Sequence, residues 1–156
     1  MRDPVTAYVA LGANLGDAPA TVREAMDAIG ALPGTRVTQR SPLYRTAPIG
    51  SSGPDYINAV VEVCTTLTAP DLLRELQVLE SRAGRLRPYR NAPRTLDLDL
   101  VLFGTAHMDS AALTIPHPRM STRAFVLMPL ADIAPSRVDA QDLRAVAGQE
   151  CRPLAP

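Results

Sequence analysis

Hydrophobic and polar positions divide the chain into short segments of two kinds. Apolar residues that alternate with polar ones, or that follow one another for a few positions, predict β-strands. Segments of this kind are Thr6–Gly12, Thr35–Thr46, Tyr56–Leu67 and Pro93–Gly104. Pro42 lies inside the second segment and predicts an edge or bulged strand there, because proline has no backbone N–H to offer a sheet.

Segments of the other kind repeat apolar residues at three- and four-residue spacing, which is the period of an amphipathic helix. The first covers 17–32, with Asp17 suited to the N-cap position, and the second covers about Ala69–Arg82. Thr68 and Asp71 resemble a capping box at the start of the second helix. The predicted buried stripes are Val22, Ala25, Met26 and Ile29 in the first helix and Leu72, Leu73, Leu76 and Leu79 in the second.

The order strand, helix, strand, strand, helix, strand is that of the split β-α-β unit. We therefore predict an α+β fold with a ferredoxin-like antiparallel sheet, both helices on one face and added C-terminal helices on the other. These short helices are predicted over about 122–132 and 140–147, and residues 1–156 are predicted to form a single domain. Residues from about 146 to 156 are predicted to be a flexible tail.

Two carboxylates interrupt the apolar pattern of the last predicted strand. Strict alternation places Leu96, Leu98, Leu100 and Leu102 on one face and Asp97, Asp99, Val101 and Phe103 on the other. Two carboxylates at such positions, roughly 6–7 Å apart, repel by about 2–3 kcal/mol at an effective dielectric constant near 20. A cation should therefore lie over them, and an Asp-x-Asp pair can hold one or two Mg²⁺ ions. The alternative is a pair of solvated residues on an edge strand.

Five arginines lie in the segment just before this strand, "ESRAGRLRPYRNAPR", which covers residues 80–94. They are Arg82, Arg85, Arg87, Arg90 and Arg94. Guanidinium groups bind phosphate oxygens in bidentate fashion, so several together suit a triphosphate. A solvated basic loop is the alternative, but cations for phosphates beside carboxylates for metal ions are the usual parts of a phosphoryl-transfer site. The chain has no Walker A motif, and "LGANLG" is adequately explained as a strand-to-helix turn.

The third predicted strand, in "PDYINAVV", carries Tyr56 and Asn58 on its mixed face. Its opposite face is wholly apolar and should be covered by the two helices. The mixed face therefore shares the side of the sheet that is predicted to carry Asp97 and Asp99. An aromatic ring for stacking and an amide with a donor and an acceptor suit a flat heterocycle, although a buried, internally satisfied pair is the alternative. We expect the functional site on this face.

Composition excludes several other classes of protein. The chain has 156 residues with 16 acidic and 16 basic side chains, all of the latter arginine, so no global field attracts nucleic acid or a membrane surface. An aromatic content of 4% disfavours an RNA-recognition module, which shares the split β-α-β architecture. No apolar run is long enough to span a bilayer and no signal peptide is present, so we expect a cytoplasmic protein. Cys64 and Cys151 are too few for a disulfide framework.

Six segments, taken in order, resemble the 6-hydroxymethyl-7,8-dihydropterin pyrophosphokinases of folate biosynthesis. They are "VALGANLGD", "SPLYRTAPIG", "PDYINAVVEV", "LQVLESRAGRLR", "PRTLDLDLVLFG" and "IPHPRMSTRAFVLMPL", within roughly residues 6–135. The resemblance implies transfer of pyrophosphate from ATP to the hydroxymethyl group of the dihydropterin, with AMP as the other product. A two-metal nucleotidyltransferase or nuclease is the remaining rival for the aspartate pair, and the pterin-type residues argue against it.

The resemblance also implies roles for individual residues. Asp97 and Asp99 would bind two Mg²⁺ ions, and Arg85 and Arg94 would be catalytic by stabilising the transferring group. The implied ATP-binding residues are Glu80, Arg85, Arg87, Arg94, Thr114, His117 and Arg123. The implied pterin-binding residues are Thr46, Ala47, Ile49, Tyr56, Asn58 and Phe125, with Tyr56 and Phe125 on either side of the ring. The implied partners are ATP and the dihydropterin, without nucleic acid or membrane, and a monomer is expected.

The chain departs from the family pattern in one loop. Where members commonly have Trp-Gly just before the Pro-Arg of the last strand, this chain has Asn91 and Ala92. The loop between Gly84 and Pro93 is also one residue shorter than in some members. In the family this loop closes over the bound substrates, so an aromatic contact on closure would have to come from another residue, such as Tyr89.

Overall fold

The computed structural model describes residues 2–47, 54–84 and 96–154. Strands and helices follow one another as the hydrophobic pattern predicts, with a small hairpin and a last strand added after the fourth predicted strand. In chain order the elements are β1 (Val5–Ala13), α1 (Ala18–Gly30), β2 (Thr35–Arg40), β3 (Tyr44–Thr46), β4 (Tyr56–Thr65), α2 (Ala69–Gly84), β5 (Asp97–Phe103), β6 (Met108–Asp109), β7 (Thr114–Ile115), a 3₁₀ turn (Met120–Thr122), α3 (Ala124–Ile133), a 3₁₀ turn (Pro135–Arg137), α4 (Ala140–Ala145) and β8 (Cys151–Pro153).

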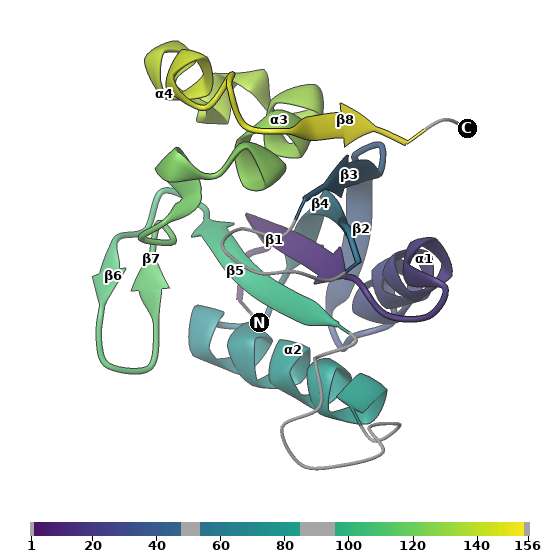
Figure 1. Cartoon of the computed structure of the whole chain (residues 1–156). Helices are drawn as coiled ribbons and strands as arrows, with labels where there is room; N and C mark the ends of the chain where they lie inside the picture. The colour runs from purple at the N-terminus through teal and green to yellow at the C-terminus, as the bar shows by residue number, and fades with distance from the viewer. Residues whose placement is uncertain (1, 48–53, 85–95, 155–156) are drawn as a thin grey trace.

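The main sheet has the strand order β5-β1-β4-β3-β8, with β2 also paired to β4 (Figure 1). Every pairing in this sheet is antiparallel. The strand that precedes α1 lies between the two strands that flank α2, which is the arrangement of the split β-α-β unit. The prediction of an α+β, ferredoxin-like fold is therefore confirmed.

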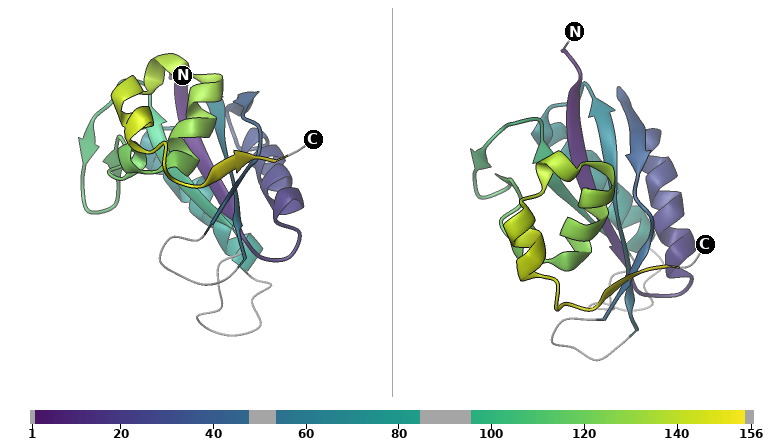
Figure 2. Two further views of the ribbon diagram at one scale, coloured as in Figure 1. Left: turned by 45° about the horizontal axis from the view of Figure 1, so that its top comes forward. Right: turned by 90° about the horizontal axis from the view of Figure 1, so that it is seen from above.

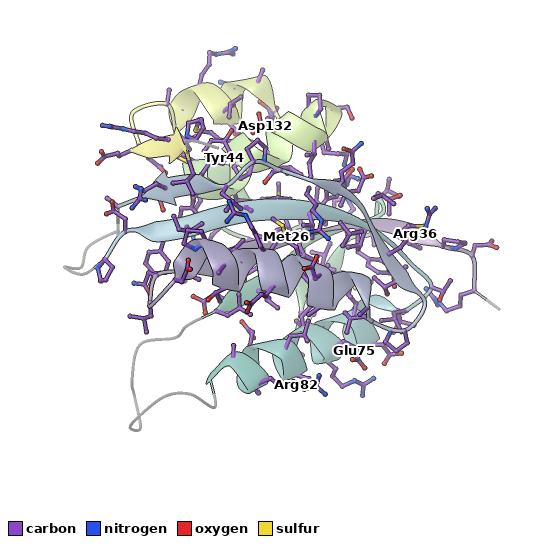
Figure 3. All side chains as sticks on the ribbon, turned by 90° about the vertical axis from the view of Figure 1, so that its right-hand side faces the viewer. Met26, Arg36, Tyr44, Glu75, Arg82 and Asp132 are labelled. Carbon is purple, nitrogen blue, oxygen red and sulfur yellow. The ribbon has the colours of Figure 1, made fainter. Side chains whose placement is uncertain are left out.

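Helices α1 and α2 cover one face of the sheet, and α3 and α4 lie on the other (Figure 3). The apolar stripes of α1 and α2 pack on the inward residues of β1, β4 and β5, and this is the larger core. Its members include Val22, Met26 and Ile29 from α1, Leu72 and Leu76 from α2, and Ile57, Ala59, Val61 and Val63 from β4. The wholly apolar face of β4 is thus covered by the two helices, as predicted.

The opposite face carries a second core beneath α3. Val126 and Leu130 of α3 pack against Tyr8, Val60 and Val101 of the sheet. Seen from above, α3 lies over the strands of this face with α4 beside it (Figure 2), and β8 pairs with β3 at the edge of the sheet. Because α3 covers only part of the face, the rest of it is left for a site.

Both main helices begin as their sequences predict. The Asp17 carboxylate accepts a hydrogen bond from the Ala20 N–H (3.2 Å) at the start of α1. The Thr68 hydroxyl accepts one from the Asp71 N–H (3.1 Å) at the start of α2. These bonds satisfy N–H groups that have no partner within the first helical turn.

A β-bulge corrects the predicted faces of β5. Tyr8 of β1 pairs with Leu102, but its neighbour Val9 pairs with Leu100, so Val101 is the extra residue. From there the alternation shifts by one position. Leu102 joins Val101 in the core under α3, and Phe103 joins the core under α1 and α2. The prediction for these last two residues was wrong, whereas Asp97 and Asp99 precede the bulge and keep their predicted face.

The second predicted strand is divided into β2 and β3, with Pro42 in the gap. Both pieces pair with β4, and the Ser41 hydroxyl between them accepts a hydrogen bond from the Val60 N–H (2.9 Å). This break has the cause that the sequence indicated, since proline cannot donate to a neighbouring strand.

Part of the predicted flexible tail forms a strand. Within residues 146–154, β8 pairs with β3, the Leu154 N–H donates to the Leu43 carbonyl (2.7 Å), and the Cys151 side chain is buried. Pairing with the edge strand β3 and burial against α3 supply the contacts that a tail would lack. At this junction the Tyr44 hydroxyl donates a hydrogen bond to Asp132 of α3 (Figure 3). None of the helices described is long and apolar enough to cross a membrane.

Candidate active site

A cavity of about 440 Å³ opens on the part of the sheet that α3 leaves uncovered. The cavity is formed by β1, β3, β4 and β5 together with the end of α2 and the start of α3. The lining residues are Ala10, Leu11, Gly12, Thr46, Ala47, Tyr56, Asn58, Glu80, Asp97, Asp99, Arg123 and Phe125. Residues distant in the sequence are thus brought to one side of the sheet.

Strand register explains how these side chains meet. Directly opposite residues in an antiparallel sheet project from the same face. Gly12 of β1 is opposite Asn58 of β4 on one side and opposite Asp97 of β5 on the other. Two residues back along β1, Ala10 is opposite Asp99. The two aspartates therefore lie beside the two small residues that form the floor of the cavity.

Two aromatic side chains and two buried polar side chains are among the residues of β3, β4 and α3 that line this cavity. Tyr56 of β4 and Phe125 of α3 both line it, and the Arg123 guanidinium lies 5.4 Å from the centre of the Phe125 ring. Asn58 is buried, and its Nδ2 donates to the hydroxyl of buried Thr46 (2.7 Å). These side chains have the aromatic faces and the amide donor and acceptor that a flat heterocycle requires.

Carboxylates also line this cavity. Asp97 is partly exposed and Asp99 is exposed, so both can reach a ligand. Glu80 of α2 accepts a hydrogen bond from the Leu98 N–H (2.8 Å), which ties the strand between the two aspartates to the helix. Among the described residues no group of three or more His, Cys, Asp and Glu side chains could hold a metal ion. Two carboxylates nonetheless fit Mg²⁺, because this ion usually takes one or two carboxylates and completes its shell with water and phosphate oxygens.

A second, smaller cavity of about 240 Å³ lies beside the first and shares Asp99 with it. It is lined by Leu73, Asp99, Leu100, Ala111, Ala112, Leu113, Thr114, His117 and Pro118. The β6–β7 hairpin (Met108–Asp109 with Thr114–Ile115) thus forms one wall. Thr114 and His117, predicted as nucleotide-binding residues, meet here.

The ring of His117 is held between backbone groups and Asp99. Its backbone N–H donates to the Val101 carbonyl (3.0 Å), and its Nδ1 accepts from the Arg119 N–H (3.2 Å). Its Nε2 lies 3.9 Å from Asp99 Oδ1. Burial lowers the pKa of His117, and the nearby Asp99 carboxylate offsets part of that shift. Because Nδ1 is an acceptor, the neutral ring carries its proton on Nε2, on the side of Asp99.

All of the predicted site residues that the structure describes line one of the two cavities. Arg85, Arg87, Arg94 and Ile49 lie outside the described residues, as does the loop with Asn91 and Ala92. Glu80 lines the larger cavity, not the cavity of Thr114 and His117. The sequence interpretation missed Ala10, Leu11 and Gly12, because the strand predicted over Thr6–Gly12 was given no part in the site. The signal was available in the alternation of β1, which places Ala10 and Gly12 on one face.

Residues 8–135 match the family model described as 7,8-dihydro-6-hydroxymethylpterin-pyrophosphokinase (HPPK). The chain belongs to this family. It is 47% identical over 129 residues to the 2-amino-4-hydroxy-6-hydroxymethyldihydropteridine pyrophosphokinase of Pseudomonas aeruginosa, covering 82% of this chain and 80% of that one. It is 39% identical over 145 residues to the enzyme of the same name from Bacillus subtilis, covering 92% and 86%.

Solved structures of HPPK-DHPS from Plasmodium falciparum share the fold. A triple mutant of that protein with STZ-DHP superposes with a TM-score of 0.70 at 13% identity, over 96% of this chain. This chain spans 42% of that longer one. The family model and the curated relatives confirm the family resemblance inferred from the six segments, and this HPPK family member is an ATP-dependent pyrophosphokinase. It transfers pyrophosphate from ATP to the hydroxymethyl group of 6-hydroxymethyl-7,8-dihydropterin, a step of folate biosynthesis.

Proposed function

We propose that the two adjoining cavities divide the substrates of this reaction, with the dihydropterin in the larger one and the nucleotide in the smaller. The observation on which this rests is that Asp99 lines both cavities. A metal ion bound to Asp97 and Asp99 would then lie at the boundary, where the triphosphate meets the hydroxymethyl group. If the pyrophosphate donor and the hydroxymethyl acceptor are both held at this boundary, their reaction becomes effectively unimolecular.

The pterin ring lies between Tyr56 and Phe125 in this proposal, and its polar edge bonds with Asn58. Thr46 and Ala47 line the same cavity, and Ile49 belongs to this set by resemblance to the family. Stacking between two aromatic rings is favourable for a flat heterocycle, and one amide can pair with a donor and an acceptor on the ring edge. This orientation directs the hydroxymethyl group toward the aspartates.

Two Mg²⁺ ions are proposed as cofactors, held by Asp97 and Asp99. Bound there, they would neutralise negative charge on the triphosphate and orient its oxygens. Glu80 supports these ligands by holding the Leu98 N–H between them. Arg123 lines the larger cavity, and its guanidinium is proposed as a phosphate ligand. By family resemblance, Arg85, Arg87 and Arg94 are proposed as further phosphate ligands.

The reaction forms a bond between the hydroxymethyl oxygen and the β-phosphorus of ATP. It breaks the bond from that phosphorus to the oxygen shared with the α-phosphate, so that AMP leaves with this oxygen and its electron pair, and the hydroxyl proton is released to water. Neutral His117, with its proton on Nε2, is placed to donate a hydrogen bond to a phosphate oxygen near Asp99. Positioning and electrostatic stabilisation then supply most of the rate enhancement.

Product analysis of Asp97→Asn tests this arrangement. We expect the wild-type chain to convert ATP and the dihydropterin to AMP in a Mg²⁺-dependent assay. The variant should fold normally but lose on the order of 10²–10³-fold in kcat, because a charge that stabilises the transition state is removed. Asp3→Asn, which changes an exposed carboxylate ahead of β1 that lines neither cavity, is the matched control and should keep the wild-type rate. ADP as the nucleotide product, or a normal rate for Asp97→Asn, would contradict the proposal.

We further propose that the chain acts in the cytoplasm as a monomeric single domain, without a nucleic-acid or membrane partner. The zero net charge supports the absence of a polyanionic partner. Light scattering on the eluting peak of a size-exclusion column tests the oligomeric state. A mass near 16.7 kDa is expected, and a mass of twice that value would contradict it.

A further inference from the structure

Gly12 occupies the centre of the cavity floor, between the residue proposed for the pterin edge and the residue proposed for the metal. It is directly opposite Asn58 on β4 and Asp97 on β5. Glycine weakens the interior of a strand, so its presence there calls for a reason. A left-handed backbone is not that reason, because the described glycines with positive φ are Gly16, Gly34 and Gly104.

The reason lies in the closeness of the Asn58 side chain. A Cβ atom added to Gly12 would lie 2.9 Å from Asn58 Oδ1 and 3.9 Å from Asn58 Cγ. The first distance is well inside van der Waals contact, so the amide would have to move. The Asn58 carboxamide therefore lies across β1 only because residue 12 has no side chain.

Thr46 holds the same amide from the other side. Asn58 Nδ2 donates to the Thr46 hydroxyl at 2.7 Å, and the two side chains are only 5% and 4% exposed. This bond uses one of the two Nδ2 hydrogens and holds the amide at its nitrogen end. The second hydrogen and Oδ1 are left to pair with a ligand, in a fixed order along its edge.

We propose that Gly12 and Thr46 are positioning residues that fix the Asn58 amide for the pterin ring. Gly12 provides the space in which the amide lies, and Thr46 holds its Nδ2 end by accepting a hydrogen bond. The inference rests on the proposed function, because it requires that Asn58 bonds the pterin. It adds that a methyl group at residue 12 impairs pterin binding through Asn58, not by blocking the cavity or displacing the metal.

Steady-state kinetics of five variants and a control test this. Gly12→Ala and Thr46→Val should each raise the KM for the dihydropterin about tenfold or more and change the KM for ATP less than about twofold, as expected for one hydrogen bond to the ring. Thr46→Ser restores the hydroxyl and should recover most of the loss. Gly148→Ala is the glycine control, since a Cβ there meets nothing within 4 Å.

The double variant separates indirect from direct action. Asn58→Ala should raise the KM for the dihydropterin, and Gly12→Ala combined with Asn58→Ala should be no worse than Asn58→Ala alone, within about twofold. Circular dichroism of each variant checks folding, and Thr46→Val with its Thr46→Ser rescue carries the test if Gly12→Ala does not fold.

Each opposite result has its own meaning. An unchanged KM for the dihydropterin in Asn58→Ala would overturn both the proposed pterin site and this inference. Suppose instead that Asn58→Ala raises the KM for the dihydropterin. The role of Gly12 would then be overturned, and the pterin site left in place, by either of two results: Gly12→Ala has no effect alone, or the double variant raises this KM by the product of the two single effects. No effect of Thr46→Val, or no recovery in Thr46→Ser, would overturn the role of Thr46.

Discussion

The carboxylate of Glu80 accepts a hydrogen bond from the backbone N–H of Leu98 at 2.8 Å. Glu80 lies near the end of α2, and Leu98 lies between Asp97 and Asp99 on β5. Because β5 is the edge strand next to β1, its outward N–H groups have no neighbouring strand in the order β5-β1-β4-β3-β8. Glu80 thus fixes the edge of the sheet that carries the two aspartates.

We predict that Glu80→Ala lowers the free energy of unfolding by about 1–3 kcal/mol, since a hydrogen bond to a charged group is lost. The KM for ATP should rise in the same variant because the strand that carries the aspartates is less well held. Urea unfolding and initial rates measure the two effects. Glu80→Gln keeps an acceptor oxygen and should lose less, and Glu75→Ala on the same helix is the control. Equal losses in the Glu75 and Glu80 variants would refute this.

Tyr56→Ala should weaken binding of the dihydropterin by about 10- to 100-fold, since it removes an aromatic contact and its buried area. Binding of a non-hydrolysable ATP analogue, measured by calorimetry on the same sample, should change less than about threefold. Tyr56→Phe keeps the ring and should bind the pterin almost as well as the wild type. A matching loss for both ligands would argue against separate cavities for pterin and nucleotide.

The β8 strand should be an integral part of the fold. Cys151 is buried and its neighbour Arg152 is exposed, so the same substitution can be compared at a buried and an exposed position of one strand. We predict that Cys151→Asp lowers the free energy of unfolding by several kcal/mol, because an unpaired charge would be buried near Asp132. Arg152→Asp should change it by about 1 kcal/mol or less. Similar unfolding midpoints for both variants in urea would show that β8 contributes little.

Stability should fall in mild alkali partly because of Cys151. Burial, with a smaller effect of the Asp132 carboxylate, raises the pKa of the Cys151 thiol to about 11. The same thiol ionises near pH 8.5 in an unfolded chain, which therefore binds fewer protons than the folded chain above that pH. This contribution to stability is complete below about pH 8.5 and is lost as the pH rises toward 11.

Urea unfolding at pH 8 and at pH 9.5 measures this effect. The free energy of unfolding should decrease less over that interval in Cys151→Ala than in the wild-type chain. Cys64→Ala removes the other thiol and should keep the wild-type decrease. A wild-type decrease that persists in Cys151→Ala would assign the effect to other groups.

Local patterns predicted the strands and helices well. The cap residues Asp17 and Thr68 act through N–H groups three residues away, and the stripe of α1 depends only on helical spacing. The division of the second strand at Pro42 followed from a property of proline itself. Asp97 and Asp99 kept their predicted face because nothing disturbs the alternation up to that point in β5.

Predictions that required a partner strand were less successful. The bulge at Val101 depends on how β1 and β5 align, and no feature of the "LDLDLVLF" pattern reports that alignment. β8 exists because β3 offers an open edge and α3 offers a surface for Cys151, and both lie more than 15 residues away along the chain. The role proposed for Gly12 was missed for the same reason, since it depends on the position of Asn58 on the neighbouring strand.

The sequence by itself determined the strands and helices of the split β-α-β unit, the face that carries the aspartates and the family, because these depend on spacing along one strand or helix and on side-chain chemistry. Tertiary structure alone decided which small residues form the floor, that Asp99 borders two cavities, and how Thr46 orients Asn58. These features depend on strand register and helix packing, which bring together atoms that the order of residues leaves far apart.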